Sequence, residues 1–293
     1  MQVLRAIGLM ILAMAVLSIA DAFIKTASLH ASLGQILLML GLGGWLIFLI
    51  LSVLRREPVY SPALWHPIVM LRNLLEVFGA IGIVIGLAMI PLSLMAAIMQ
   101  TAPLILTLGG ALLLGERVGP RRWAAVIAGL IGMLIVVRPF GADFTGWELF
   151  AVMGVTAFAF RDLATRVAPA TVSSLFLSLW GLFAVAIPGA GMLLITGAPV
   201  SLSGAALWPM LGAIVLTPIG YLSVTMAMRM APASTVGPFR YSRLLFNTAL
   251  GVFVFQESID VWTGVGVALI LGSGLYVFAR EAQIARSTAA ATG

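Results

Sequence analysis

The sequence contains no cysteine, two histidines and a single lysine, and charged residues make up only 9% of its 293 residues. Without cysteine the chain has no disulfide, no thiol nucleophile and no cysteine-ligated metal site. Soluble domains carry about 25% charged residues, so this chain has too few charges to cover a water-facing surface. The low charge excludes a soluble enzyme, a nucleic-acid-binding module, a coiled coil and a disordered chain.

Apolar residues dominate what is present: 62% of the chain is hydrophobic and its mean hydropathy is +1.15. A bilayer core of about 30 Å takes about 20 apolar helical residues. The apolar runs are Val3–Phe23, Gly34–Val53, Pro67–Ile90, Leu92–Leu114, Trp123–Val137, Trp147–Phe160, Val172–Thr196, Ala205–Met226, Ser234–Phe255 and Val261–Ala279. They lack the strict alternation of barrel strands. We therefore predict an all-α integral membrane protein with ten transmembrane helices.

The first run has an alternative interpretation as a cleaved signal peptide. Arg5 gives it a basic start, and Ala20-Asp21-Ala22 has the small-x-small pattern of a cleavage site. We predict a retained span instead, because the internal repeat described below needs this helix.

Arginine and lysine are distributed unevenly between the two predicted sides of the membrane. Eleven lie on the side that holds both termini, and two, Lys25 and Arg138, lie on the other. Arg72, Arg240 and Arg243 lie within spans. Because positive residues concentrate in cytoplasmic loops, we predict a multi-pass protein of the inner or plasma membrane with both termini in the cytoplasm.

The two halves of the chain repeat each other at a constant offset of 141 residues. The aligned pairs are Asp21 and Asp162, Lys25 and Arg166, Gly79 and Gly220, Met89-x-Pro91-x-Ser93 and Met230-x-Pro232-x-Ser234, Gly110 and Gly251, and Glu116 and Glu257. Each half, residues 3–138 and 147–280, holds five spans, and an odd number inserts the second half upside down. Inverted repeats build a midplane site that opens alternately to each side. The repeat therefore predicts a transporter that works by alternating access.

The segments Ala88–Val137 and Arg229–Phe278, each with the M-x-P-x-S entry and the later glutamate, resemble the end of an EamA domain. From residue 5 to residue 280 the chain resembles the ten-helix EamA branch of the drug/metabolite transporter (DMT) superfamily. The resemblance implies two five-helix repeats around a central cavity and export of small organic metabolites, foremost amino acids. YddG-type amino-acid exporters belong to this branch, and no motif here singles them out.

One departure from the superfamily concerns multidrug export. The small four-helix multidrug members rely on a glutamate in their first helix, whereas Met10–Ala20 contains no acid. Proton-coupled export of cationic drugs is therefore not carried over from the resemblance. A multidrug or lipophilic-cation exporter remains an alternative, as does a carrier of phosphorylated or nucleotide sugars.

Four charged residues fall inside the predicted spans away from their ends, where a charge usually faces a cavity or a partner. Arg72 and Glu76 are four residues apart, and Arg240 and Arg243 are three apart, with Asn247 continuing their stripe. One interpretation is structural, with Arg72 and Glu76 neutralising each other. The three arginines of the spans then share one acid, so two of them lack an acidic partner. If Arg72 reaches the lipid headgroups instead, only one arginine lacks an acidic partner. We predict that the surplus guanidinium binds a substrate carboxylate or phosphate, which arginine pairs with bidentately.

Neutral side chains give further cavity candidates. Hydrogen-bonding candidates are Asn73, Gln100, Tyr221 and Tyr241, and aromatic candidates for an apolar substrate group are Phe78, Phe158 and Trp180. Each aromatic has the alternative of core or lipid-facing packing. Pro218 and Pro238 are candidate gating bends, because proline within a span frees a carbonyl and permits a kink.

Two further patterns are predicted to be structural. Asp21 with Lys25 and Asp162 with Arg166 are one-turn pairs, which we interpret as interfacial ion pairs that end the first and sixth helices. Small residues recur every four positions at Ala124, Ala128 and Gly132, and at Gly264, Ala268 and Gly272. Such stripes let helices approach closely in lipid, either within each half or at a dimer interface.

Other functional classes find little support. His30 and His66 lie in predicted connections, and no HExxH, GxSxG or P-loop motif is present, so we predict no enzyme, no metal, no cofactor and no direct use of ATP. A retinal protein needs a lysine within a span, and Lys25 sits at a helix end. A passive channel fits charged residues in a repeated bundle less well than a binding site does. The predicted partners are a small-molecule substrate and membrane lipid, and no nucleic acid.

Overall fold

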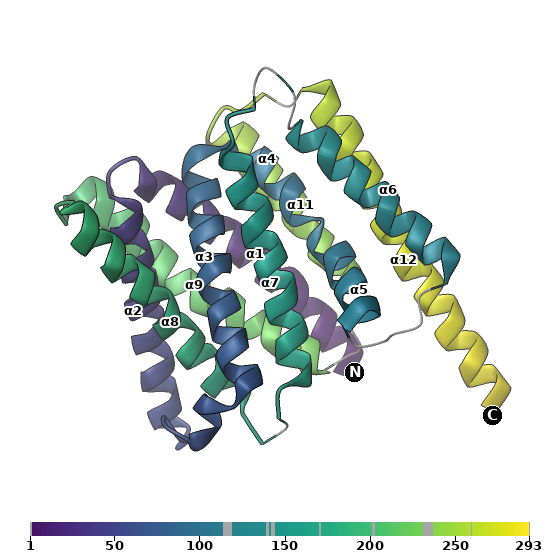
Figure 1. Cartoon of the computed structure of the whole chain (residues 1–293), viewed down its shortest axis with the longest axis horizontal. Coiled ribbons are helices and arrows are strands. Elements are labelled where there is room, and N and C mark those ends of the chain that lie inside the picture. The colour runs from purple at the N-terminus through teal and green to yellow at the C-terminus, as the bar shows by residue number, and fades with distance from the viewer. Residues whose placement is uncertain are drawn as a thin grey trace.

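Apolar runs of this length form helices because a backbone in lipid must satisfy its own hydrogen bonds. The computed structural model (Figure 1) describes residues 2–113, 119–138, 141, 144–169, 171–200, 203–230, 237–258 and 260–292, without some helical side chains, those of Arg166 and Arg229 among them. This part of the chain is helical and contains no strand. The all-α prediction is therefore confirmed.

The helices follow the predicted spans. They are α1 (Gln2–Ser28), α2 (Leu33–Leu54), η1 (Pro62–Trp65), α3 (Pro67–Met89), α4 (Leu92–Met99), α5 (Ala102–Leu113), α6 (Pro120–Val137), α7 (Trp147–Val167), α8 (Ser174–Thr196), α9 (Gly204–Met230), η2 (Gly237–Tyr241), α11 (Ser242–Phe253) and α12 (Val261–Thr292). Among the described residues, six stretches are long and apolar enough to cross a membrane, and α6 and α12 carry shorter apolar stretches.

Two predicted spans differ from a single straight helix. The fourth is divided into α4 and α5 at Gln100 and Thr101. Pro103 has no N–H to bond the carbonyl of Met99, so a continuous helix would lose a bond here. The ninth begins, in its described part, as the 3-10 helix η2 before α11. Pro232 of the repeated motif lies outside the described residues, and Pro238 falls in η2.

The helix pairs reveal the relation between the repeats. α1 packs on α9, α3 on α7, α2 on α8 and α6 on α12. In the repeat, α1, α2, α3 and α6 are equivalent to α7, α8, α9 and α12. The α1–α9 contact is therefore equivalent to the α7–α3 contact. The α2–α8 and α6–α12 contacts each join a helix to its own equivalent. α2 and α8 run antiparallel, since Gly34 lies against Met192 and Gly44 against Leu182. Equivalent helices of the two halves thus run in opposite directions, which is the inverted arrangement that the sequence predicted.

One of the two small-residue stripes packs across the two halves, at Gly132. Gly132 of α6 lies against Gly266 and Ile270 of α12, and the two helices stand side by side at one edge of the bundle (Figure 1). The expectation of packing within each half was wrong, because α6 and α12 are equivalent helices that pair across the pseudo-two-fold axis. A Cβ at Gly264 or Gly272 would have no neighbour within 4 Å.

A glycine substitution tests the close approach of α2 and α8. A Cβ on Gly189 would lie 2.3 Å from the amide nitrogen of Leu38, whereas a Cβ on Gly191 of the same helix would meet nothing within 4 Å. Gly189→Ala should lower the unfolding midpoint in detergent, because overpacking costs about 1–3 kcal/mol. Gly191→Ala is the matched control and should unfold at the wild-type temperature or above. Equal midpoints for the two variants would contradict the packing.

A second test concerns Asp260, which precedes α12 and pairs with Arg138 at the end of α6. The hydroxyl of Thr263 donates to Asp260 at 2.6 Å. This bond, with further contributions from the Thr263 amide and Arg138, lowers the pKa of Asp260 to about 2.

A carboxyl with a depressed pKa stabilises the fold above its unfolded pKa of about 3.9, and the contribution is lost as the pH falls through the folded value. The unfolding midpoints of wild type and Asp260→Asn should therefore differ by a constant amount above about pH 5 and converge towards pH 2. Thr263→Val should move the convergence to higher pH. A difference that persists undiminished at pH 2 would contradict the assignment.

Candidate functional site

A buried carboxylate, Glu76 of α3, organises the middle of the bundle. It is 2% exposed and lies 2.8 Å from Arg72 one turn earlier. Arg161 of α7 donates to both carboxylate oxygens at 3.0 and 3.1 Å. The hydroxyl of Tyr221 on α9 donates to Glu76 at 2.8 Å and also bonds Arg72. Three helices from both halves thus meet at one carboxylate.

The same network continues along α7 to the ninth span. Arg161 lies 2.8 Å from its neighbour Asp162, and Arg240 of η2 lies 3.0 Å from the other oxygen of Asp162. The guanidinium of Arg161 also lies over the rings of Phe158 and Tyr221, at 4.6 and 5.2 Å from their centroids. We call Arg72, Glu76, Arg161, Asp162, Arg240 and Tyr221 the central charge network.

The central charge network carries an excess of positive charge. Its three arginines face two carboxylates, so one guanidinium charge is left without its own anion. Arg161 is 12% exposed and shares both acids with another arginine. A buried site with this balance favours an additional anionic group, because unpaired charge is costly in a low-dielectric interior.

A second charged cluster lies between α1 and α11. Asp21 is 3% exposed. Arg243 donates to it through Nε and Nη2 at 2.8–3.2 Å, and Asn247 donates at 3.0 Å. Each acid and base here has its partner, so this cluster is electrically neutral.

The predicted charge pairing is partly wrong. Arg72 does pair with Glu76, but Arg240 and Arg243 each have an acid, Asp162 and Asp21. The two acids were missed for different reasons: α7 runs past its predicted end at Phe160 and carries Asp162 into the bundle, whereas Asp21 lies within the predicted first span and was assigned to an interfacial pair.

The predicted interfacial pair of Asp21 with Lys25 was wrong as well. Lys25 lies 3.8 Å from Glu257 instead. Asp162 bonds Arg161 and Arg240; the side chain of Arg166 lies outside the described residues.

The remaining predicted residues differ in how close they lie to the central charge network. Asn73 accepts a bond from Arg72 at 3.0 Å and so adjoins the central charge network, as does Phe158. Gln100 is 3% exposed at the end of α4, and Tyr241 is 6% exposed with its hydroxyl against Gly274.

Trp180 and Phe78 lie elsewhere. Trp180 donates to the carbonyl of Val59 at 3.0 Å, and Phe78 is 46% exposed. Of the gating candidates, Pro218 lies within α9, and of Pro238 the structure describes only the backbone.

Sequence reasoning missed Arg161 as a site residue, because it was assigned to a cytoplasmic loop. The available signal was its neighbour Asp162, which the repeat aligns with Asp21. Two acids at the same place in both repeats indicate a shared structural position. Within the described part of the chain, no three His, Asp or Glu residues stand close enough to hold a metal ion.

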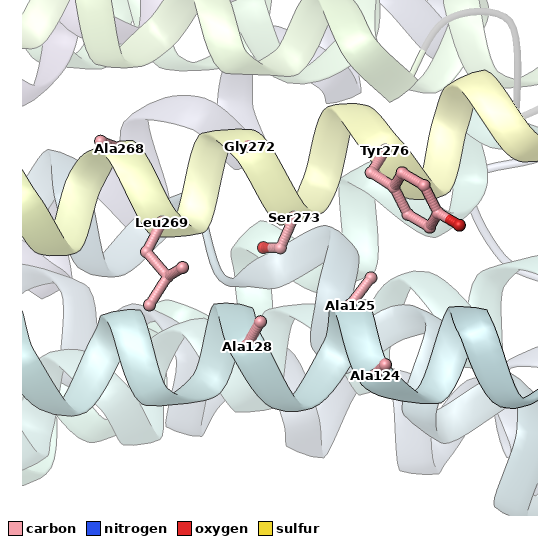
Figure 2. Close-up of a pocket in the computed structure, with 8 residues that line it drawn as sticks. All are labelled: Ala124, Ala125, Ala128, Ala268, Leu269, Gly272, Ser273 and Tyr276. Carbon is pink, nitrogen blue, oxygen red and sulfur yellow. The ribbon is translucent and has the colours of Figure 1, made fainter.

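A groove of about 320 Å³ lies between α6 and α12. Its lining residues are Ala124, Ala125 and Ala128 on α6 and Ala268, Leu269, Gly272, Ser273 and Tyr276 on α12; Figure 2 shows Leu269 and Ser273 pointing towards α6. Its lining is almost entirely apolar and includes no charged side chain. It does not offer the chemistry that would recognise a polar solute, so the central charge network is the stronger candidate site.

The family assignment follows from two separate matches along the chain. The EamA-like transporter family matches residues 4–138 and residues 145–279. The chain belongs to this family and is a membrane transporter of the DMT superfamily rather than an enzyme.

Named relatives agree with this class. A riboflavin transporter of Rhizobium johnstonii is 32% identical over 219 residues, covering 74% of this chain and 72% of the relative. An S-adenosylmethionine uptake transporter of Rickettsia bellii is 27% identical over 214 residues, 72% of each chain. A pseudopaline exporter of Pseudomonas aeruginosa is 25% identical over 272 residues, covering 90% of this chain and 92% of the relative.

A solved structure, described only as the crystal structure of a protein, has the same fold. It covers 90% of this chain and 93% of its own, with a TM-score of 0.63 and 19% identity.

The role of Glu76 in the fold can be measured directly. Glu76→Gln leaves Arg72 and Arg161 without their shared anion, and breaking a buried pair costs about 3–5 kcal/mol. The unfolding midpoint in detergent should therefore fall sharply. Glu57→Gln is the control, because Glu57 is partly exposed and bonds the Ser173 hydroxyl; it should change little. A Glu76→Gln variant as stable as the control would contradict the network.

Proposed function

We propose that this chain is a secondary carrier that exports a small organic metabolite with a carboxylate or another anionic group. Amino acids and molecules derived from them are the first substrate class. The two inverted repeats would alternate their access between the two sides of the membrane. The central charge network would bind the anionic group, with Arg161 as its principal contact.

The excess of one positive charge in the central charge network is the observation that carries this proposal. A substrate carboxylate would balance that charge, and the planar guanidinium of Arg161 can bind it through two parallel hydrogen bonds. A lipophilic cation would add to the excess, so the multidrug alternative is disfavoured. A sugar phosphate remains the competing anionic substrate.

The names of the relatives support a polar organic metabolite. Riboflavin and S-adenosylmethionine both combine a ring system with polar groups, and S-adenosylmethionine also carries a carboxylate. Export is named for the pseudopaline exporter, which aligns with 90% of this chain, whereas uptake is named for the S-adenosylmethionine transporter. The distribution of arginine and lysine supports cytoplasmic termini in the inner or plasma membrane.

Uptake into liposomes that contain the purified protein tests the proposal. The labelled panel is a mixture of amino acids, S-adenosylmethionine, riboflavin, a sugar phosphate and a lipophilic cation, offered with and without a pH gradient. We expect saturable uptake of a carboxylate-bearing solute. Arg161→Leu should reduce that uptake at least about tenfold, because a charge-assisted contact to substrate is lost. Arg138→Leu, the same change at the exposed pair with Asp260, should transport as wild type.

The other outcomes decide between the alternatives. Uptake of the sugar phosphate alone would establish the second anionic class. Uptake of the cation alone, undiminished by Arg161→Leu, would overturn the proposal and make the arginines structural. A flux that rises with concentration without saturating would indicate a channel.

A further inference from the structure

The junction between α3 and α4 is held by two oppositely charged side chains. Lys25 of α1 donates to the carbonyl of Ile90 at 2.8 Å and to that of Leu87 at 3.4 Å. The carboxylate of Glu257 accepts from the amides of Leu92 at 2.6 Å and Ser93 at 2.9 Å, and from the Ser93 hydroxyl at 2.8 Å. Both sets of backbone groups are those that helix ends leave unsatisfied. The carboxylate therefore caps α4, and the ammonium group caps α3.

The charges match the polarity of the two helix ends. The C-terminal end of a helix carries partial negative charge and the N-terminal end partial positive charge. Lys25 lies at the end of α3 and Glu257 at the start of α4, and the two side chains lie 3.8 Å apart. The ammonium group also lies 5.6 Å from the ring centroid of Phe255. We call this arrangement of Lys25, Glu257 and the start of α4 the helix-end clamp.

A glycine makes room for the clamp. A Cβ on Gly251 would lie 2.7 Å from Oε2 of Glu257 and 3.4 Å from the amide nitrogen of Ser93. The amide of Glu257 bonds the carbonyl of Gly251 at 3.0 Å, which turns the chain back over the end of α11. Any larger residue at position 251 would push the carboxylate away from α4.

The clamp joins the two repeats through the residues that the repeat preserves. Lys25 and Ser93 come from the first half, and Gly251 and Glu257 from the second. The sequence carries the same set in exchanged halves, as Arg166 and Ser234 with Gly110 and Glu116. Apart from Asp162, which aligns with Asp21, the central charge network is not repeated in this way: the 141-residue offset aligns Arg72 with Ala213 and Glu76 with Thr217.

This contrast points to different roles for the two clusters. A carrier has a single substrate site in the middle of the bundle, so the residues of that site need no counterpart in the other repeat. A closure must exist at each membrane face and alternate, so its residues are expected in both halves. The clamp lies where α1 ends, next to buried apolar side chains that include Ile24, Leu92 and Met95.

We propose that the helix-end clamp closes the pathway between the repeats at the membrane face where α1 ends. Opening on that face requires the Glu257 carboxylate to leave the N-terminus of α4. The inference rests on the proposed carrier function. Its test needs no substrate, so the closure and the proposed substrate transport can fail separately.

Thiol labelling tests the closure, because the natural chain has no cysteine. Met95, one turn into α4 and fully buried, is changed to cysteine as the single reporter. A membrane-impermeant maleimide is added to sealed vesicles from the side on which α1 ends. In a Glu257→Gln background the labelling rate should rise about tenfold, the change that loss of one charge-assisted hydrogen bond produces in an opening equilibrium. Gly251→Ala, which displaces the carboxylate and keeps its charge, should raise the rate as well.

Two matched variants distinguish opening at the clamp from a general loosening of the bundle. Glu116→Gln makes the same change at the aligned position of the other repeat and should not raise labelling from this side. The exchange of Lys25→Glu with Glu257→Lys restores an ion pair but reverses it against both helix ends, so labelling should stay fast. Gel filtration of each purified variant checks that the protein is monodisperse before its labelling rate is compared with that of the others.

Three results would overturn the inference. The first is an unchanged labelling rate in both Glu257→Gln and Gly251→Ala. The second is an equal rise in Glu116→Gln, which would show general loosening. The third is full closure in the exchanged pair, which would reduce the clamp to an ordinary ion pair.

Discussion

The structure depends on one constraint, that a charge inside a lipid-embedded bundle must find an opposite charge or a dipole. Glu76 meets it by taking donors from three helices at once. Because the anion is shared, α3, α7 and α9 are held together across the boundary between the repeats. The shared anion also leaves Arg161 with capacity for a further anionic partner, which is how a structural requirement becomes a candidate binding site.

The inverted repeat organises the rest of the bundle. Equivalent helices pair with each other or exchange partners, so most of the packing is symmetric. Glycines such as Gly34 and Gly132 permit these antiparallel approaches, because lipid offers little hydrophobic driving force and close packing must supply the attraction. The central charge network departs from this symmetry, because Arg72 and Glu76 have no charged counterparts in the other repeat. Chemistry that serves one substrate needs a single site, while closure at two faces needs two.

Much of the architecture could be predicted from the sequence. Apolar length located the spans, and the constant offset between Asp21 and Asp162 established the repeat and, with it, the inversion. The candidate site was predicted less well. Asp162 was placed at an interface because α7 was taken to end at Phe160, so Arg161 was counted as a loop residue. Charged residues lower the local hydropathy, so the length of a span that contains them is underestimated.

By itself the sequence determined the class of protein, the number of repeats and their opposed orientation, because these depend on composition and period alone. Only the tertiary structure decided which charges meet. Arg243 finds Asp21 across 222 positions of the chain, and Glu257 finds the amide of Leu92 at the start of α4 across 165. Such pairs follow from the packing of α1, α4 and α11 against one another. Coulombic attraction acts through space and leaves no trace in the local spacing of residues.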